Sequence, residues 1–146
     1  MWIDIGINST HAPLATAFPE VLTRAREAKV RAGLLTGTSL ASAEAALAQA
    51  SAAGPGFGAT VGVHPHDAAG APEDLAAQLR CLAAHPAACA IGETGLDFNR
   101  DYSARPVQER VFQTQLALAE ETGLPLFLHV RDAADRFQGC FAPFEG

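Results

Sequence analysis

The sequence predicts an α/β protein built on a parallel sheet. Short runs rich in Val, Ile, Leu and Phe alternate with longer segments of helical period, which is typical of β-α-β units. Five such runs begin near residues 2, 32, 57, 88 and 125. Their separation, roughly 25 to 37 residues, matches a βα repeat. The 146 residues are 49% hydrophobic, so the chain has enough apolar material for a packed core.

The first unit begins with an apolar run from Trp2 to Ile7, which predicts a strand. After a loop, apolar residues at helical spacing predict a helix over about residues 19–30. The next apolar run, residues 32–36, predicts the second strand and ends in Gly37-Thr38-Ser39.

The second helix has signals for both of its ends. Ser39 is a favoured N-cap residue, and an Ala-rich segment follows it as far as about Ala53. Gly54-Pro55-Gly56 then ends the helix. The third strand is expected at residues 57–63, followed by the segment His64-Pro65-His66.

The remaining units follow the same alternation. A third helix is expected to begin near Pro72, because proline and the acidic residues after it suit a first helical turn. The fourth strand is expected at residues 88–92, and a Gly-rich turn follows it. A helix over about residues 106–122 and a strand at residues 125–130 come next. A last helix begins near Asp132.

Composition excludes several classes of protein. The formal net charge is −6, which argues against a broad basic surface for nucleic acid, so phosphate chemistry would need a local cation. Cys81, Cys89 and Cys140 lack zinc-site spacing and are expected to be reduced packing residues. The sequence contains neither an apolar run long enough to span a membrane nor a secretory signal pattern. The expected location is therefore the cytoplasm.

The residues alone leave two architectures open. An eight-unit TIM barrel needs about 250 residues, so this chain would supply about five strands of one. A complete five-stranded, doubly wound domain of flavodoxin type fits the length better. Length by itself therefore favours the doubly wound domain.

Polar side chains follow four of the five predicted strands. They are Asn8 after the first strand, His64 after the third, Glu93 after the fourth, and His129 with Arg131 at the end of the fifth. Because functional residues of parallel α/β folds lie at the C-terminal ends of strands, these side chains are expected to converge on one rim. Imidazole and carboxylate groups there would suit Mg²⁺, Mn²⁺ or Zn²⁺.

Each candidate also has a purely structural interpretation. Glu93 could be a solvated turn residue, and His129 a hydrogen-bonded histidine within the sheet. His64, together with His66, could brace the turn around Pro65. Arg131 and Arg100 could grip a phosphate through their planar guanidinium groups, although most surface arginines have no such role.

Five ordered blocks of the sequence resemble the TatD family of metal-dependent deoxyribonucleases, at the family's spacing and over nearly the whole chain. The blocks are Asp4–Asn8, Val61–His66, Ile91–Phe98, Gln108–Leu116 and Leu124–Ala133. The resemblance implies a TIM barrel of the metallo-dependent hydrolase type, truncated after about five strands. Residues 1–146 would then form a single partial barrel domain, about the first half of the family fold.

The resemblance also implies an activity: Mg²⁺-dependent 3′ to 5′ exonucleolytic hydrolysis of DNA, with RNA as a further substrate. Single-stranded 3′ ends would be the partner and no membrane would be involved. By residue-to-residue match, Glu93 and His129 correspond to metal ligands and His64 to a histidine of the same rim, which makes these three the catalytic candidates. Arg131 is the candidate for the substrate phosphate.

Two departures from the family pattern matter. Many members begin with Asp-x-His-x-His, whereas this chain has Gly6 and Asn8 at the histidine positions, as the TatD proper branch does. Asn8 would be a weaker, uncharged metal ligand, which favours Mg²⁺, with Mn²⁺ or Zn²⁺ as alternatives. The family's further metal-binding histidine and its catalytic aspartate lie on strands six to eight, which this chain does not contain.

Two other functions stay open at this point. The chain could be a non-catalytic half-barrel that acts by pairing its sheet edges, as a homodimer or with a complementing C-terminal half. Alternatively, the same metal site could hydrolyse a small-molecule ester or amide, as amidohydrolases do.

Overall fold

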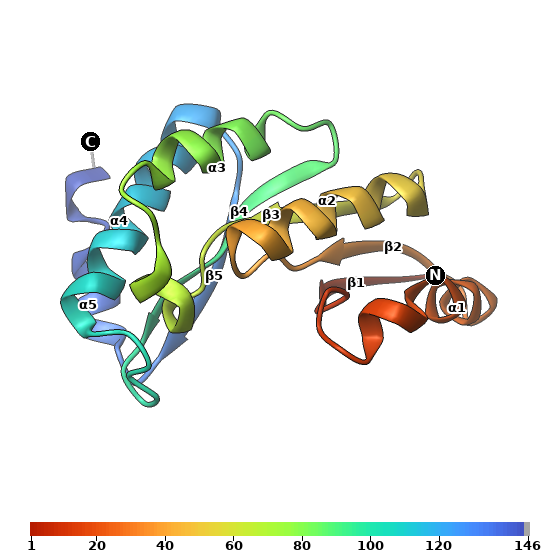
Figure 1. Cartoon of the computed structure of the whole chain (residues 1–146), viewed down its shortest axis with the longest axis horizontal. Helices are drawn as coiled ribbons and strands as arrows, with labels where there is room; N and C mark the ends of the chain where they lie inside the picture. Colours follow the sequence, from red (N-terminus) through yellow and green to blue (C-terminus); the bar gives the residue numbers. More distant parts are fainter. Residues whose placement is uncertain (145–146) are drawn as a thin grey trace.

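The computed structural model describes residues 1–144 and contains one curled sheet of five parallel strands in the order β1-β2-β3-β4-β5 (Figure 1). The strands are Trp2–Ile7 (β1), Val30–Leu35 (β2), Phe57–Val61 (β3), Ala88–Asp97 (β4) and Leu126–Arg131 (β5). A flavodoxin-type sheet would have the order 2-1-3-4-5, whereas sequential neighbours are typical of a barrel wall. The strand order therefore decides for the half-barrel, although length alone favoured a doubly wound domain.

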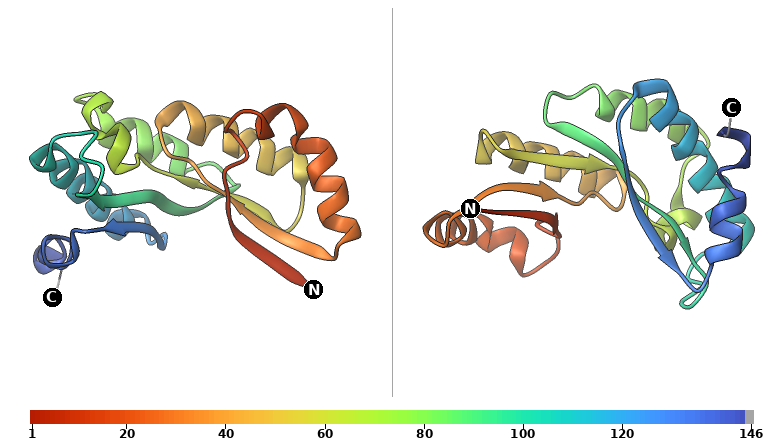
Figure 2. Two further views of the ribbon diagram at one scale, coloured as in Figure 1. Left: turned by 90° about the horizontal axis from the view of Figure 1, so that it is seen from below. Right: turned by 180° about the vertical axis from the view of Figure 1, so that it is seen from behind.

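Helices cover the outer side of the curved sheet (Figure 2). The α-helices are Leu14–Glu27 (α1), Leu40–Ala53 (α2), Leu75–Ala83 (α3), Arg105–Thr122 (α4) and Ala134–Gly139 (α5), with short 3₁₀ helices at Pro65–Gly70 (η1) and Ala142–Phe144 (η2). The main core lies between sheet and helices, where Leu35, Val61 and Ile91 pack with Leu47 and Leu79. Among the described helices, none is both long and apolar enough to cross a membrane.

The first three helices differ in how well the sequence predicted where they begin. Ser39 caps α2 as expected: its side chain accepts the Ser42 N–H, and the Ser42 hydroxyl accepts the Ser39 N–H in return. The first helix was expected to begin near Pro19, but it begins at Leu14 and includes that proline. The third helix begins at Leu75, a few residues after Pro72.

The fourth strand differs most from the expectation. A turn was predicted after residue 92, but β4 continues to Asp97 through Gly92 and Gly95, which have φ of +137° and +144°. A Cβ atom at either glycine would overlap a backbone carbonyl oxygen of β5, at Phe127 or His129. These glycines therefore allow the two strands to approach closely, whereas in the sequence they suggested a turn.

Both outer strands carry exposed apolar side chains. On β1, Trp2 is 70% exposed, and Ile3 and Ile5 are also exposed. On β5, Val130 is 50% exposed and Leu128 is exposed as well. Within residues 1–144 the sheet thus has two open parallel edges, one on each of these strands.

The cysteines are only partly the packing residues that the sequence suggested. Cys140 is buried against the second apolar cluster, which includes Phe112 and Leu96. Cys81 and Cys89 are exposed, so the expectation is wrong for these two. All three are free thiols.

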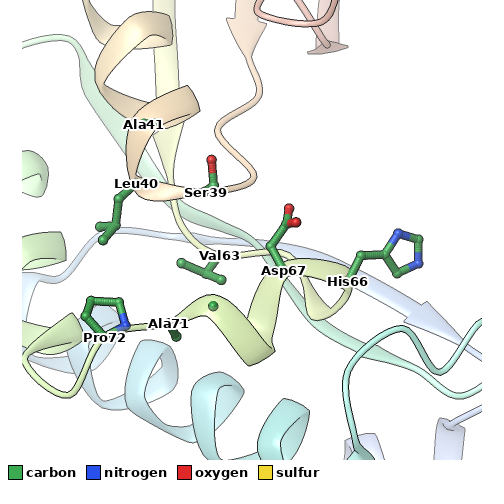
Figure 3. A pocket seen from close by; sticks show the side chains of 9 residues that line it. Ser39, Leu40, Ala41, Val63, His66, Asp67, Ala71 and Pro72 are labelled. Carbon is green, nitrogen blue, oxygen red and sulfur yellow. The ribbon is translucent and has the colours of Figure 1, made fainter.

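A pocket of about 400 Å³ lies between the start of α2 and η1 (Figure 3). Leu40, Val63 and Pro72 give it an apolar wall. The His66 ring points away from these side chains, and the only other ionisable residue of the lining is Asp67. This pocket therefore lacks the grouped ligands that a metal ion requires.

Candidate metal centre

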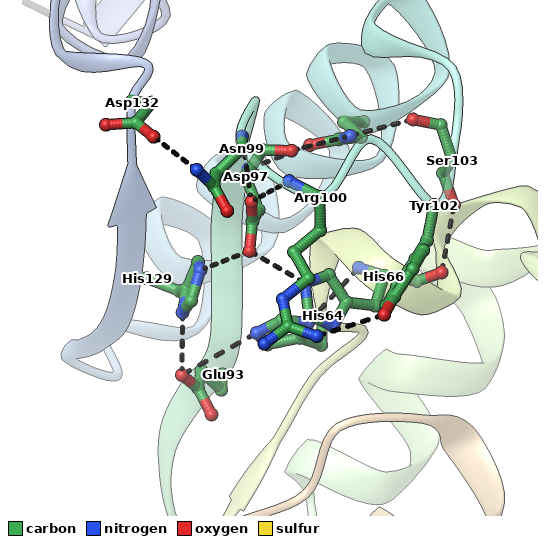
Figure 4. A network of polar contacts seen from close by, with 11 residues as sticks. His64, His66, Glu93, Asp97, Asn99, Arg100, Tyr102, Ser103, His129 and Asp132 are labelled. Carbon is green, nitrogen blue, oxygen red and sulfur yellow. Dashed lines mark hydrogen bonds and ion pairs between the residues drawn. The ribbon is translucent and has the colours of Figure 1, made fainter.

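Three of the residues singled out in the sequence meet at one end of the sheet (Figure 4). His64 follows β3, Glu93 lies on β4 and His129 lies on β5. Oε1 of Glu93 is 3.2 Å from Nδ1 of His129 and 3.8 Å from Nε2 of His64. One donor atom from each residue lies within 4.8 Å of the others. These nitrogen and oxygen donors match the ligand preferences of a divalent cation.

A β-bulge directs Glu93 toward this cluster. Its neighbours on either side pair with two consecutive residues of β5, Phe127 and Leu128, so Glu93 itself is the extra residue of the ladder. Its own N–H donates to the carbonyl oxygen of Gly37 on the other side of β4. Because a bulge locally bends the strand and re-aims a side chain, this irregularity turns the carboxylate toward the rim.

The surroundings of His64 decide where its proton lies. The residue is 8% exposed. Nδ1 of its ring accepts the backbone N–H of His66 at 3.1 Å. Burial, helped by the neighbouring His129 and His66 and opposed by Asp97, lowers the pKa of His64 from 6.5 to about 4. The ring is therefore neutral near pH 7, with its single proton on Nε2, the atom that faces Glu93.

Asp97 is a functional candidate that the sequence reasoning missed. Its side chain is buried, and Oδ2 lies 2.7 Å from Nε2 of His66 and 3.3 Å from Nε2 of His129. Oδ1 accepts the backbone N–H groups of Asn99 and Arg100. Burial raises the pKa of Asp97, but these four hydrogen bonds outweigh burial and hold it well below its usual range.

The carboxylate of Asp97 faces Nε2 of His129 and so bears on which ring nitrogen presents a lone pair. When Nε2 of His129 donates its proton to Asp97, Nδ1 presents a lone pair to Oε1 of Glu93 at 3.2 Å. The lone pairs of Nδ1 and Oε1 repel each other at this separation unless a proton or a cation lies between the two atoms. The pairing of a carboxylate with the outer nitrogen of a ligating histidine is also the usual support for metal-binding histidines.

A signal for Asp97 was present in the sequence. In an extended strand, alternate residues share a face, so residues 93, 95 and 97 point the same way once the strand is continued past Gly92. The prediction of a turn at Glu93 removed Asp97 from that face. The carboxylate was thus hidden by a wrong strand boundary.

A cleft of about 490 Å³ opens in front of the cluster. Its lining brings together residues on or just after all five strands, including Asn8, Thr36, His64, Glu93 and His129. Asn8 is exposed and lines this cleft. Arg131 is exposed near the end of β5 and is not part of the lining.

Two buried glutamines of α4 hold the strand ends that carry the site. The Gln115 side chain accepts the N–H of Val63 and donates to the Val63 carbonyl oxygen, immediately before His64. Gln108 does the same for Asp97, since its Oε1 accepts the Asp97 N–H and its Nε2 donates to the Asp97 carbonyl oxygen. The helix thereby fixes the backbone on which both side chains are mounted.

Comparison with known proteins agrees with this fold. The family model described as TatD related DNase matches residues 3–142. The chain is 45% identical over 141 residues to a protein of Dickeya dadantii named 3′-5′ ssDNA/RNA exonuclease TatD, covering 97% of this chain and 53% of that protein. A protein of Klebsiella pneumoniae with the same name is also 45% identical over 141 residues, with the same two shares covered.

Solved structures share this fold. A TatD homologue from Escherichia coli superposes with a TM-score of 0.85 at 26% identity, covering 97% of this chain and 57% of that one. An uncharacterised amidohydrolase from Saccharomyces cerevisiae superposes with a TM-score of 0.79, also at 26% identity, covering 96% and 51%. The chain therefore spans about half the length of the curated relatives and solved structures that it matches.

Proposed function

Since the chain belongs to the TatD family of DNases, we propose that it acts in metal-dependent hydrolysis of nucleic acid, removing nucleotides from single-stranded 3′ ends of DNA and also of RNA. Its curated relatives are named for this activity. The observation that carries the proposal is the approach of Nδ1 of His129 to Oε1 of Glu93, since these atoms leave a place for a cation between supported ligands. The cytoplasmic location expected from the sequence belongs to the same proposal.

Glu93 and His129 would hold the cation, and the exposed amide of Asn8 would offer a further oxygen from the same cleft. Mg²⁺ is the ion proposed, because the set contains a carboxylate and no thiolate; Mn²⁺ and Zn²⁺ suit the same donors. When bound, such an ion lowers the pKa of a coordinated water and neutralises phosphate charge.

The chain's own residues would orient the reacting groups. Asp97 would hold the ring of His129 so that Nδ1 faces Oε1 of Glu93. His64 keeps its proton on Nε2, and this N–H would donate to a non-bridging phosphate oxygen that enters beside Glu93. Arg131, two residues after His129 on β5, would pair with phosphate further along the strand of nucleic acid.

The direct test is degradation of 3′-labelled single-stranded DNA by the purified chain, with Mg²⁺ and with EDTA. The variant Glu93→Ala should lose the activity, whereas Glu44→Ala, which removes an exposed carboxylate of α2, should keep it. Loss of label that continues in EDTA or in Glu93→Ala would contradict the proposal. So would a folded chain that leaves the label intact in Mg²⁺.

Substrate binding should also depend on the ion. The chain carries a net charge of −6, so its overall field repels a polyanion, and the cation supplies much of the local attraction. We expect weak binding of single-stranded DNA that falls further when EDTA is added. An affinity that EDTA leaves unchanged would overturn this part of the proposal.

A second role is favoured by the two open sheet edges. Trp2 and Ile5 on β1, and Leu128 and Val130 on β5, are exposed apolar residues next to unpaired strand edges. We propose that these edges pair with further strands, from a second copy or from a complementing C-terminal half, which would also extend the wall of the cleft. Gel filtration of the chain alone tests self-pairing, and a stable monomer at high concentration contradicts it.

A further inference from the structure

An exposed aromatic ring lies beside the histidine cluster. Tyr102, in the loop between β4 and α4, is 62% exposed. Its ring centroid is 4.8 Å from that of His66, and the His66 centroid is in turn 4.3 Å from that of His64. Tyr102 is thus separated from the candidate metal centre by the width of one imidazole ring (Figure 4).

The side chain of Arg100 lies beside this ring. The guanidinium group of Arg100 donates to the hydroxyl of Tyr102 at 3.0 Å and lies over the ring at 5.9 Å from its centroid. In a chain with net charge −6, this places a positive group next to the cleavage centre proposed above. Arg100 was one of the two arginines that the sequence offered for a phosphate, and neither it nor Arg131 belongs to the lining of the cleft.

The loop that carries both residues is tied down on two sides. The Arg100 N–H donates to Asp97, and the hydroxyl of Ser103 donates to the carbonyl oxygen of His66 while accepting the N–H of Ala69. Gln108 also donates to the Ser103 carbonyl oxygen. The position of Tyr102 between these anchors is therefore set by the scaffold, although its own surface faces solvent.

We propose that Tyr102 and Arg100 form a nucleotide subsite beside the metal centre: a base of the single-stranded substrate stacks on the free face of Tyr102, and Arg100 pairs with an adjoining phosphate. Every base has a π-face, so stacking on an aromatic side chain tolerates any sequence. A guanidinium group suits phosphate through paired, charge-assisted hydrogen bonds. The inference rests on the proposed function, because it assigns part of the same substrate to these residues.

The chain offers a selective probe of this subsite, since Tyr102 is its one tyrosine. Biosynthetic replacement of tyrosine by 3-fluorotyrosine gives a single ¹⁹F NMR resonance that reports on this ring. The ligand is a short single-stranded oligodeoxynucleotide whose 3′-terminal linkages are phosphorothioates, added with Mg²⁺. Matched oligonucleotides lack one base each, at the terminal, second or third position, and fluorescence anisotropy records binding of every one.

The complete oligonucleotide should shift the resonance, and removal of one particular base should abolish most of that shift. Tyr102→Ala should weaken binding by about fivefold or more, whereas Tyr102→Phe, which keeps the ring, should bind within about twofold of the natural chain. Affinity for Mn²⁺ should be unchanged in both variants, because Tyr102 is not among the cluster of donors.

The outcomes separate this inference from the function on which it rests. If anisotropy shows binding and the chain hydrolyses DNA, but the resonance stays in place or shifts equally with every abasic ligand, the subsite is refuted and the activity stands. Equal affinity of the natural chain and folded Tyr102→Ala has the same meaning. If no oligonucleotide binds and none is hydrolysed, the proposed function and the subsite fail together.

Discussion

Nε2 of His129 lies 3.3 Å from Oδ2 of Asp97, a buried carboxylate. Because Asp97 also accepts two backbone N–H groups, it is fixed in place and remains ionised. It therefore governs which nitrogen of His129 presents a lone pair toward Glu93. The candidate metal centre depends on a residue that contributes no ligand of its own.

Replacement of Asp97 tests this arrangement. Asp97→Asn keeps the size of the side chain and removes the charge, so His129 is no longer held in one tautomer. Loss of such a supporting carboxylate weakens metal binding by roughly 10- to 100-fold. Calorimetric titration with Mn²⁺ measures the affinity, and Asp101→Asn, an exposed aspartate paired with Arg105, is the matched control. A folded Asp97→Asn chain of unchanged affinity would refute the role.

Gln115 should matter for stability far more than its neighbour Gln113. Gln115→Leu leaves the N–H and the carbonyl oxygen of Val63 without their side-chain partners in a buried place. Each unsatisfied group costs about 1–3 kcal/mol, so we expect a clear fall in the free energy of unfolding. Gln113→Leu, on the exposed side of the same helix, should change it little. Urea titrations compare the variants, and equal midpoints would argue against a stabilising role for the hydrogen bonds between Gln115 and Val63.

Gly95 should not tolerate a side chain. Its φ of +144° disfavours any residue with a Cβ atom, and that atom would overlap the carbonyl oxygen of His129 on β5. We expect Gly95→Ala to destabilise the chain by at least about 2 kcal/mol. Gly139→Ala places its Cβ in open space and serves as the control. Thermal unfolding followed by circular dichroism measures both; similar midpoints would show that β4 and β5 can separate without cost.

Stability should fall as the pH drops from about 6.5 toward 4. Burial and the neighbouring histidines lower the pKa of His64 to about 4 in the folded chain, while its ordinary value is 6.5. Between these two values the unfolded chain binds a proton at His64 that the folded chain does not bind, so acid favours unfolding. In His64→Gln this contribution is absent, and the free energy of unfolding should depend less steeply on pH over that range. Parallel slopes for the two chains would contradict the assignment.

Much of the fold could be predicted because its signals are local. The five strands alternate with helices as the apolar pattern indicated, and Ser39 caps α2 because a cap needs only the next helical turn. The rim positions of His64 and His129 follow from the ends of parallel strands. The pattern failed at Pro19, which was expected to begin a helix, and at Gly92, which was expected to end a strand; both residues lie within their elements.

The sequence by itself therefore determined the βα repeat, the family resemblance and most of the polar side chains at the rim. The tertiary structure decided what those side chains can do. The order of the strands, the close approach of β5 that requires Gly95, and the bulge at Glu93 all depend on contacts between segments far apart in the chain. Asp97 gained its role only because β4 continues alongside β5, since a buried carboxylate is ionised and orienting only where several donors from different elements meet it.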